Sequence, residues 1–266
     1  MKSRDEVFAT LEVAKRVWAV AAVHGEAERL AALHRELARR FAAGDRLVYL
    51  GNYLGHGPDV PGVLDELLWF RRDLLIEPGL EPWDIVYLRG AQEEMWLKLL
   101  QIQFAAEPTQ VLEWMLGQGL AATLAAYGNA DEGRARLREG TVAATRWTGS
   151  LRDAMQARPG HYELLTGLHR AAFTAGGELL FVHAGVDPHR PLTEQGDTFW
   201  WGSGYFADID APYQGFRKVV RGYDRNHAGF AAGPFTATLD GGAGFGGTLN
   251  AACLDLDGRI VEWIEV

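Results

Sequence analysis

Cysteine, long apolar runs and positive charge are all scarce in this sequence. Its 266 residues include one cysteine, Cys253, so no disulfide can form within the chain, and a reducing compartment is indicated. No apolar run approaches the ~20 residues that a membrane-spanning helix needs. The opening stretch, MKSRDEVFAT, has no apolar region of the signal-peptide kind. These absences predict a cytoplasmic protein without membrane contact.

The charge balance narrows the partners further. The 26 Lys and Arg residues against 35 Asp and Glu give a formal net charge of −9, which disfavours a nucleic-acid phosphate backbone as a partner. Apolar residues make up 48% of the chain, enough to fill a core. A chain of this length is therefore expected to form one large domain, 1–266.

Four short apolar runs have strand character, at 17–21, 47–50, 85–88 and 179–182. The segments that follow them, at 22–25, 50–58, 89–93 and 181–185, are rich in Gly, His, Asn and charged residues. Helical patterns at 26–41 and after Pro58 alternate with the first strands, which predicts a parallel sheet with crossover helices. Loops at the carboxyl ends of such strands bind ligands, so we expect these four loops to converge.

The second half of the chain has a different pattern. From 93 to about 170 there is no strand signal, and helices that form a cap are expected, with starts at 108–109 and 131–132 and one helix over 111–124. Strands at 218–221 and 234–239 and a hairpin turning at Asp257-Gly258 predict a second, partly antiparallel sheet packed on the first. The glycine-rich stretch 241–247 is predicted to be a loop between strands, with only a weak phosphate-cradle signal.

Four segments carry a resemblance to a known family: AVHGE from Ala22, LGNYLGHGPD from Leu50, LRGAQEE from Leu88 and FVHAGVDP from Phe181. They resemble, in the same order, motifs of the calcineurin-like metallophosphoesterases, which include serine/threonine phosphatases and bacterial dinucleoside-polyphosphate hydrolases. The resemblance covers most of the chain. It implies a two-sheet αββα sandwich with a helical insertion at about 93–170, and a site that uses two divalent metals such as Mn, Fe or Zn.

The residues that perform this chemistry in the family are mostly replaced here. By resemblance, the chain has Ala22 for the first Asp, Asn52 for the metal-bridging Asp, Gly55 and His56 for an Asp-Arg pair, Ala91 and Gln92 for Asn-His, and Tyr223 for a late His. Only His24 and His183 remain as family-type ligands. The glycines that shape the loops are retained, so the replacements are concentrated on the positions that bear the chemistry.

These replacements predict a pseudophosphatase, that is, a non-catalytic binding or regulatory protein with no bound metal. One alternative is an active phosphoesterase, of phosphoprotein or dinucleoside-polyphosphate type, whose rebuilt site would add Asp224 or His227 to His24 and His183. Another is a metal-free phosphate or nucleotide sensor that uses His56, Arg89 and Arg221. The two remaining histidines could also be core residues bonded to backbone carbonyls.

The predicted cap suggests a protein partner or self-association. It carries six large side chains: Met95, Trp96, Trp114, Met115, Tyr127 and Trp147. Aromatic and Met side chains are enriched at the centres of interfaces, so an apolar patch on the cap is one expectation. The alternative is that these side chains only pack the cap onto the sandwich. A small phosphate-bearing ligand is the other partner that the resemblance implies.

Overall fold

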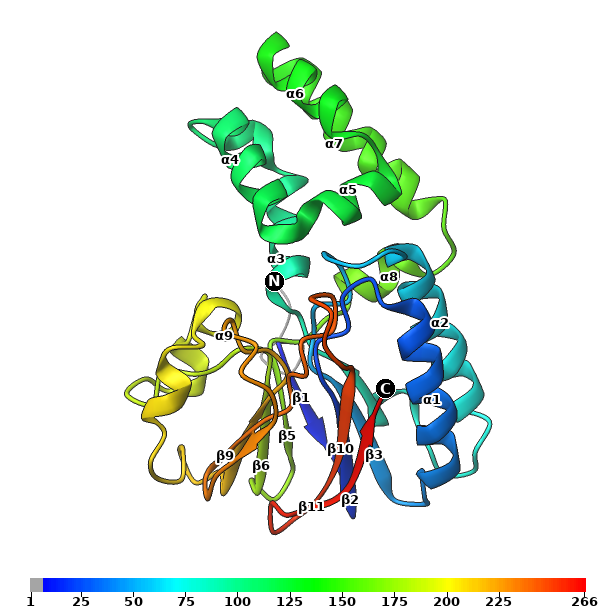
Figure 1. Ribbon diagram of the computed structural model, residues 1–266, viewed down its shortest axis with the longest axis vertical. Coiled ribbons are helices and arrows are strands. Elements are labelled where there is room, and N and C mark those ends of the chain that lie inside the picture. The colour runs from blue at the N-terminus through cyan, green and yellow to red at the C-terminus, as the bar shows by residue number, and fades with distance from the viewer. Residues whose placement is uncertain (1–6) are drawn as a thin grey trace.

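The computed structural model describes residues 7–266, so most of the stretch MKSRDEVFAT, on which the signal-peptide expectation rests, lies outside the described residues. Two sheets pack face to face (Figure 1). Helices α1 (Ala27–Arg40) and α2 (Val60–Leu74) lie on the outer side of one sheet, and α9 (Thr198–Trp201) lies on the outer side of the other. Within residues 7–266, no helix is long and apolar enough to cross a membrane.

The first sheet has five strands in the order β11-β10-β2-β3-β4. They are β2 (Arg16–Val20), β3 (Asp45–Tyr49), β4 (Ile85–Tyr87), β10 (Asn250–Asp255) and β11 (Ile260–Glu265). Strands β2, β3 and β4 are parallel, with α1 and α2 as crossovers, as predicted. The predicted hairpin at Asp257-Gly258 forms, but its assignment to the second sheet is wrong, because β10 pairs antiparallel with β2.

The second sheet has six strands in the order β1-β5-β6-β7-β9-β8. They are β1 (Phe8–Leu11), β5 (Ala171–Thr174), β6 (Leu179–Val182), β7 (Lys218–Arg221), β8 (Ala231–Ala232) and β9 (Thr236–Thr238). Strands β6, β7 and β9 were predicted. Strands β1, β5 and β8 were not predicted.

Strand β2 shows how the core is divided. Successive side chains of a strand point to opposite faces. Trp18 and Val20 therefore belong to the core under α1 and α2, whereas Val17 and Ala19 belong to the core between the two sheets. Burial on both faces explains why this strand is continuously apolar.

The segment between β4 and β5 is helical, as predicted. It contains α3 (Ala91–Leu99), α4 (Pro108–Met115), α5 (Ala121–Tyr127), α6 (Ala130–Glu139), α7 (Thr141–Gln156) and α8 (His161–Thr166). We call residues 94–166 the cap, and Figure 1 shows α4 to α7 standing above one end of the sandwich. Short 3₁₀ helices occur at Pro82–Asp84, Ile102–Phe104, Leu192–Glu194 and Tyr205–Asp208.

The predicted single helix over 111–124 is wrong. A π-helical turn, Leu116–Leu120, separates α4 from α5, and inside it Gly119 has φ 101°. This left-handed backbone is strained for any residue with a Cβ. A Cβ on Gly119 would also lie 2.2 Å from Nε2 of His56. The helix is interrupted where the cap contacts the loop after β3.

Most of the large cap side chains are internal. Met95, Trp96, Met115, Tyr127 and Trp147 are buried in the same core as α1 and α2. Trp114 is 53% exposed and contacts Trp201 edge to face, with ring centroids 6.5 Å apart. The aromatic surface that the cap presents is therefore much smaller than the sequence suggested.

Candidate functional site

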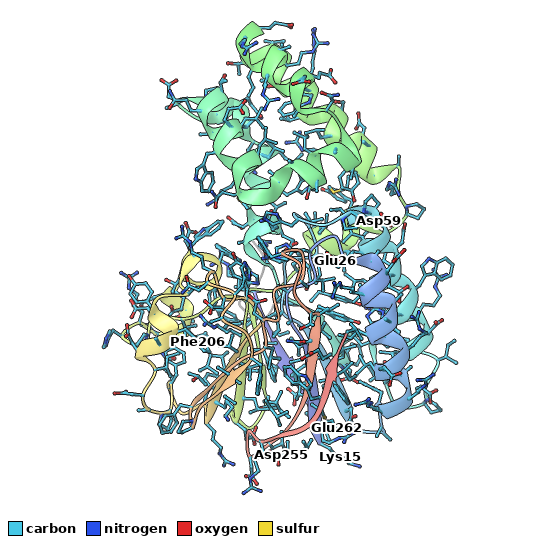
Figure 2. The ribbon with its side chains drawn as sticks, in the orientation of Figure 1. Lys15, Glu26, Asp59, Phe206, Asp255 and Glu262 are labelled. Atoms are coloured by element: carbon cyan, nitrogen blue, oxygen red, sulfur yellow. The ribbon has the colours of Figure 1, made fainter. Side chains whose placement is uncertain are left out.

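The loops at the carboxyl ends of the strands meet beneath the cap. Figure 2 shows Lys15, just before β2, at the far end of the molecule, and Glu26, just after the β2 loop, beneath the cap. The loops touch through backbone hydrogen bonds, such as Val23 N–H to Asn52 O at 3.1 Å and Ala22 N–H to Gly222 O at 3.0 Å. We call residues 22–25, 51–58, 89–93, 183–185, 222–227 and 240–247 the loop cluster.

Glycine allows these loops to approach one another closely. A Cβ on Gly90 would lie 2.2 Å from the backbone N of Asn52, and a Cβ on Gly57 would lie 2.7 Å from the carbonyl carbon of Gly25. Real Cβ atoms do not come this close to backbone atoms. The retained glycines therefore have a direct structural role, which is to bring three loops into backbone contact.

Glu93 joins two of these loops through one buried carboxylate. Its Oε2 accepts from the backbone N–H of Asn52 at 2.9 Å and of Gly90 at 2.7 Å. Its Oε1 accepts from Tyr53 at 2.8 Å and Leu54 at 2.9 Å. Burial raises the pKa of the Glu93 carboxyl group, and the four N–H donors oppose that rise.

The two family-type histidines have the same hydrogen-bonding arrangement. Nδ1 of His24 lies 3.2 Å from Leu54 O, and Nδ1 of His183 lies 2.7 Å from Leu50 O. A carbonyl only accepts, so Nδ1 carries the hydrogen and Nε2 is an acceptor. Both Nε2 atoms are buried without a partner. Burial lowers the pKa of His24 to about 3 and of His183 to about 4, so both rings are neutral near pH 7.

Aromatic rings surround these imidazoles. The ring of Phe245 lies 5.3 Å from that of His24, 4.3 Å from that of His56 and 4.0 Å from that of His227, centroid to centroid. Tyr223 is stacked on His183 at 5.2 Å with 8° between the planes. Phe245 and Tyr223 therefore pack directly against the rings of the two histidines.

Sequence reasoning missed Phe245. It lies in the glycine-rich loop 241–247, where Gly242, Gly244 and Gly246 all have positive φ. A Cβ on Gly244 would lie 2.8 Å from Cβ of His24, so the loop passes directly over that histidine. One phenylalanine between alternating glycines was the available signal, because such a loop can place a single ring against a neighbouring site.

The proposed replacement ligands are held by other protein groups. Oδ2 of Asp240 accepts from the backbone N–H of Asp224 at 2.8 Å and from Nδ1 of His227 at 2.9 Å. The Asp224 carboxylate pairs with Arg221 at 3.3 Å. Asp240, like Phe245, was not among the predicted site residues, and it fixes the loop that follows β7.

The predicted anion-binding residues each contact other protein groups. Arg221 donates to Thr238 Oγ1 and to Ser203 O, pairs with Asp224, and lies over the ring of Phe206 at 4.3 Å. Arg89 pairs with Glu94 at 3.3 Å. His56 instead lies against the cap and Phe245, and burial lowers its pKa.

The cap is attached to the loop cluster at the positions where the resemblance places catalytic groups. Gln92 Nε2 donates to Gln118 O at 2.8 Å, and the backbone N–H of Gly55 donates to Thr123 Oγ1 at 2.8 Å. His56 packs against Gly119. The cap is therefore contacted by three residues at positions where the resemblance places catalytic groups, Gly55, His56 and Gln92.

The loop cluster does not fit a pair of divalent metal ions. Such a pair needs anionic oxygen ligands, one of which must bridge. Asn52 is neutral, and its Oδ1 already accepts from the backbone N–H of Gln92 at 3.0 Å. Ala22 and Ala91 have no side-chain atom that can coordinate a metal ion. Among residues 7–266, no group of three or more His, Cys, Asp or Glu side chains is arranged to hold a metal ion.

Comparison with known proteins identifies the fold. No family model and no curated protein sequence matches this chain. A solved structure described as "Crystal structure of a putative diadenosine tetraphosphatase" matches with a TM-score of 0.57 and 20% identity over 97% of this chain and 96% of that one. The cold-active protein-tyrosine phosphatase of a psychrophilic Shewanella sp. matches with 0.54 and 14% over 100% and 85%.

At these identities the similarity shows the fold alone. The chain has an α/β fold with two mixed sheets that matches metallophosphoesterase structures, and that fold prediction is confirmed. The loss of catalysis, the site residues and the partner remain predictions.

Proposed function

We propose that this protein is a pseudophosphatase, which has kept the metallophosphoesterase fold without its two-metal chemistry and acts by binding. The observation that supports this most directly is Asn52. It occupies the position of the bridging carboxylate, and its amide oxygen serves to hold the loop that follows β4. A neutral amide engaged in this way is a poor bridge between two dications.

Two further positions support the same proposal. By resemblance, Gln92 replaces the His that protonates the leaving oxygen, and His56 replaces the Arg that binds the phosphate. Gln92 has no titratable proton to give to a leaving group, and its side chain holds the cap. His56 is shorter than the arginine of the family and is charged only when protonated. Its lowered pKa keeps it neutral near pH 7.

The test is a metal and activity measurement on protein purified without chelator. We expect no stoichiometric Mn, Fe or Zn, and no metal-dependent hydrolysis of a phosphomonoester or a dinucleoside polyphosphate above background. Asn52→Asp alone should not restore hydrolysis, because catalytic groups act as a unit. Turnover that His183→Ala abolishes, with one or more metal ions per chain, would overturn the proposal.

One observation favours the rebuilt-site alternative. The Nε2 atoms of His24 and His183 are buried acceptors without a partner, which is the state of an imidazole that is ready to bind a metal. The metal and activity measurements distinguish this alternative from the pseudophosphatase proposal, because the alternative requires both bound metal and His183-dependent turnover. Zinc content that also falls in a His227→Ala variant would identify the replacement ligand.

The binding surface that we propose includes the exposed pair Trp114 and Trp201, which joins the cap to α9. Light scattering at several concentrations tests self-association, and Trp114→Ser should weaken it. Val142→Ser, at another exposed cap position, is the control. A strict monomer that also captures no partner from its native host would leave the surface without a role.

A further inference from the structure

A cavity unrelated to the loop cluster lies between α1, α2 and the loop after α2. Its volume is about 730 Å³, within the range of small-molecule sites. It is lined by α1 from Ala31 onward, by α2 from Glu66 onward, and by the segments 41–44 and 77–80 that follow the two helices. Figure 1 shows these helices side by side on the outer face of the five-stranded sheet.

The floor of this cavity is aromatic and apolar. The buried ring of Phe70 is stacked on His34, with centroids 3.8 Å apart and 10° between the planes. Leu74, Phe41 and Leu80 extend the apolar lining. A flat apolar group could therefore be held against the floor and walls of the cavity.

A buried chain of hydrogen bonds orients one carboxylate at the cavity. Tyr49 O–H donates to Nε2 of His34 at 2.8 Å, and Nδ1–H of His34 donates to Oε1 of Glu66 at 2.6 Å. Burial lowers the pKa of His34 and raises that of Tyr49, so both of these groups are neutral near pH 7. The Glu66 side chain is 28% exposed, and its other oxygen remains available to the cavity that it lines.

The surrounding charge is negative. Among the described residues, three acidic side chains line the cavity, Glu66, Asp73 and Glu77, together with one cation, Arg35. Both helices also end at the cavity, and helix carboxyl ends favour cations. The last-turn arginines bond elsewhere, for example Arg40 to Trp263 O and Arg71 to Pro82 O.

We propose that this cavity binds a small organic monocation with an apolar body, an aryl- or alkylammonium ion, whose ammonium group pairs with Glu66. The apolar floor takes the body of the ligand, and the oriented carboxylate takes its charge. An anion could pair with Arg35 but would also meet three carboxylates and two helix carboxyl ends. This proposal does not depend on the pseudophosphatase proposal, since none of its residues belongs to the loop cluster.

The experiment measures binding of matched probes to the full-length protein by protein-observed NMR or calorimetry. 2-Phenylethylamine should bind saturably, 2-phenylethanol should bind at least about tenfold more weakly because it lacks the charge-assisted hydrogen bond, and 3-phenylpropionate should not bind. Glu66→Gln should weaken amine binding about tenfold or more. Asp153→Asn, an exposed cap carboxylate that makes the same charge change, should leave it unchanged.

A second variant keeps the test decisive if Glu66→Gln does not fold. Asp73 and Glu77 are exposed, so the Asp73→Asn/Glu77→Gln double variant should fold and should bind the amine several-fold more weakly. Equal affinity for the amine and the alcohol, amine binding unaffected by Glu66→Gln, or no binding of any probe at millimolar concentration would each overturn the proposal.

Discussion

Replacing Glu93 with glutamine tests whether one buried carboxylate holds the loop cluster together. Each oxygen of Glu93 accepts two backbone N–H groups. Glutamine keeps one acceptor oxygen and turns its NH₂ group toward the other two N–H donors. Two hydrogen bonds to a charged acceptor are lost, at about 1.5–3 kcal/mol each. We therefore expect a loss of roughly 3–6 kcal/mol of unfolding free energy, a large part of the 5–15 kcal/mol typical of a domain.

Glu94→Gln, at the next residue, is the matched control. Glu94 pairs with Arg89 at 3.3 Å and with the half-exposed Lys98 at 3.5 Å, and partly exposed pairs of this kind contribute about 0–1 kcal/mol. Urea unfolding followed by circular dichroism gives both free energies, and the m-value reports whether the unfolding transition is unchanged. A loss below about 1 kcal/mol for Glu93→Gln, or equal losses for the two variants, would refute the reasoning.

Two further predictions concern the cap and the histidines. Gly119→Ala should destabilise the protein by about 1–3 kcal/mol, because alanine is strained in a left-handed backbone and its Cβ would displace His56. Gly117→Ala, in open space in the same turn, should stabilise it by about 0.4–1 kcal/mol, and equal effects in thermal unfolding would contradict the steric argument. The folded-state pKa of His183 is about 4, below the ordinary 6.5. The unfolded state therefore takes up protons first as the pH falls, and stability is lost below about pH 6.5. His183→Asn keeps a donor for Leu50 O and should make the loss between about pH 6.5 and about pH 4.5 smaller by about 2–3 kcal/mol. An unchanged pH profile would mean that this ring is not buried and neutral.

Local pattern was enough to predict most of the elements and the convergence of the loops. The apolar runs at β2, β3, β4 and β6, the helical spacing of α1 and the glycines beside the loops are all properties of a few neighbouring residues. Steric and hydrogen-bonding rules act at that range, so the alternation of strands and helices follows from them. The convergence of the loops followed in turn from the parallel sheet.

The tertiary structure decided what fills the site and what surrounds it. Glu93 meets Asn52 across 41 residues of sequence, and His183 meets Leu50 across 133. Phe245 reaches His24 from the other end of the chain. Three other features also depend on contacts between distant parts of the chain. They are the pairing of β10 with β2, the break at Gly119 and the cavity beside Glu66. No local pattern encodes these contacts, because each depends on which surfaces are buried together once the whole chain has packed.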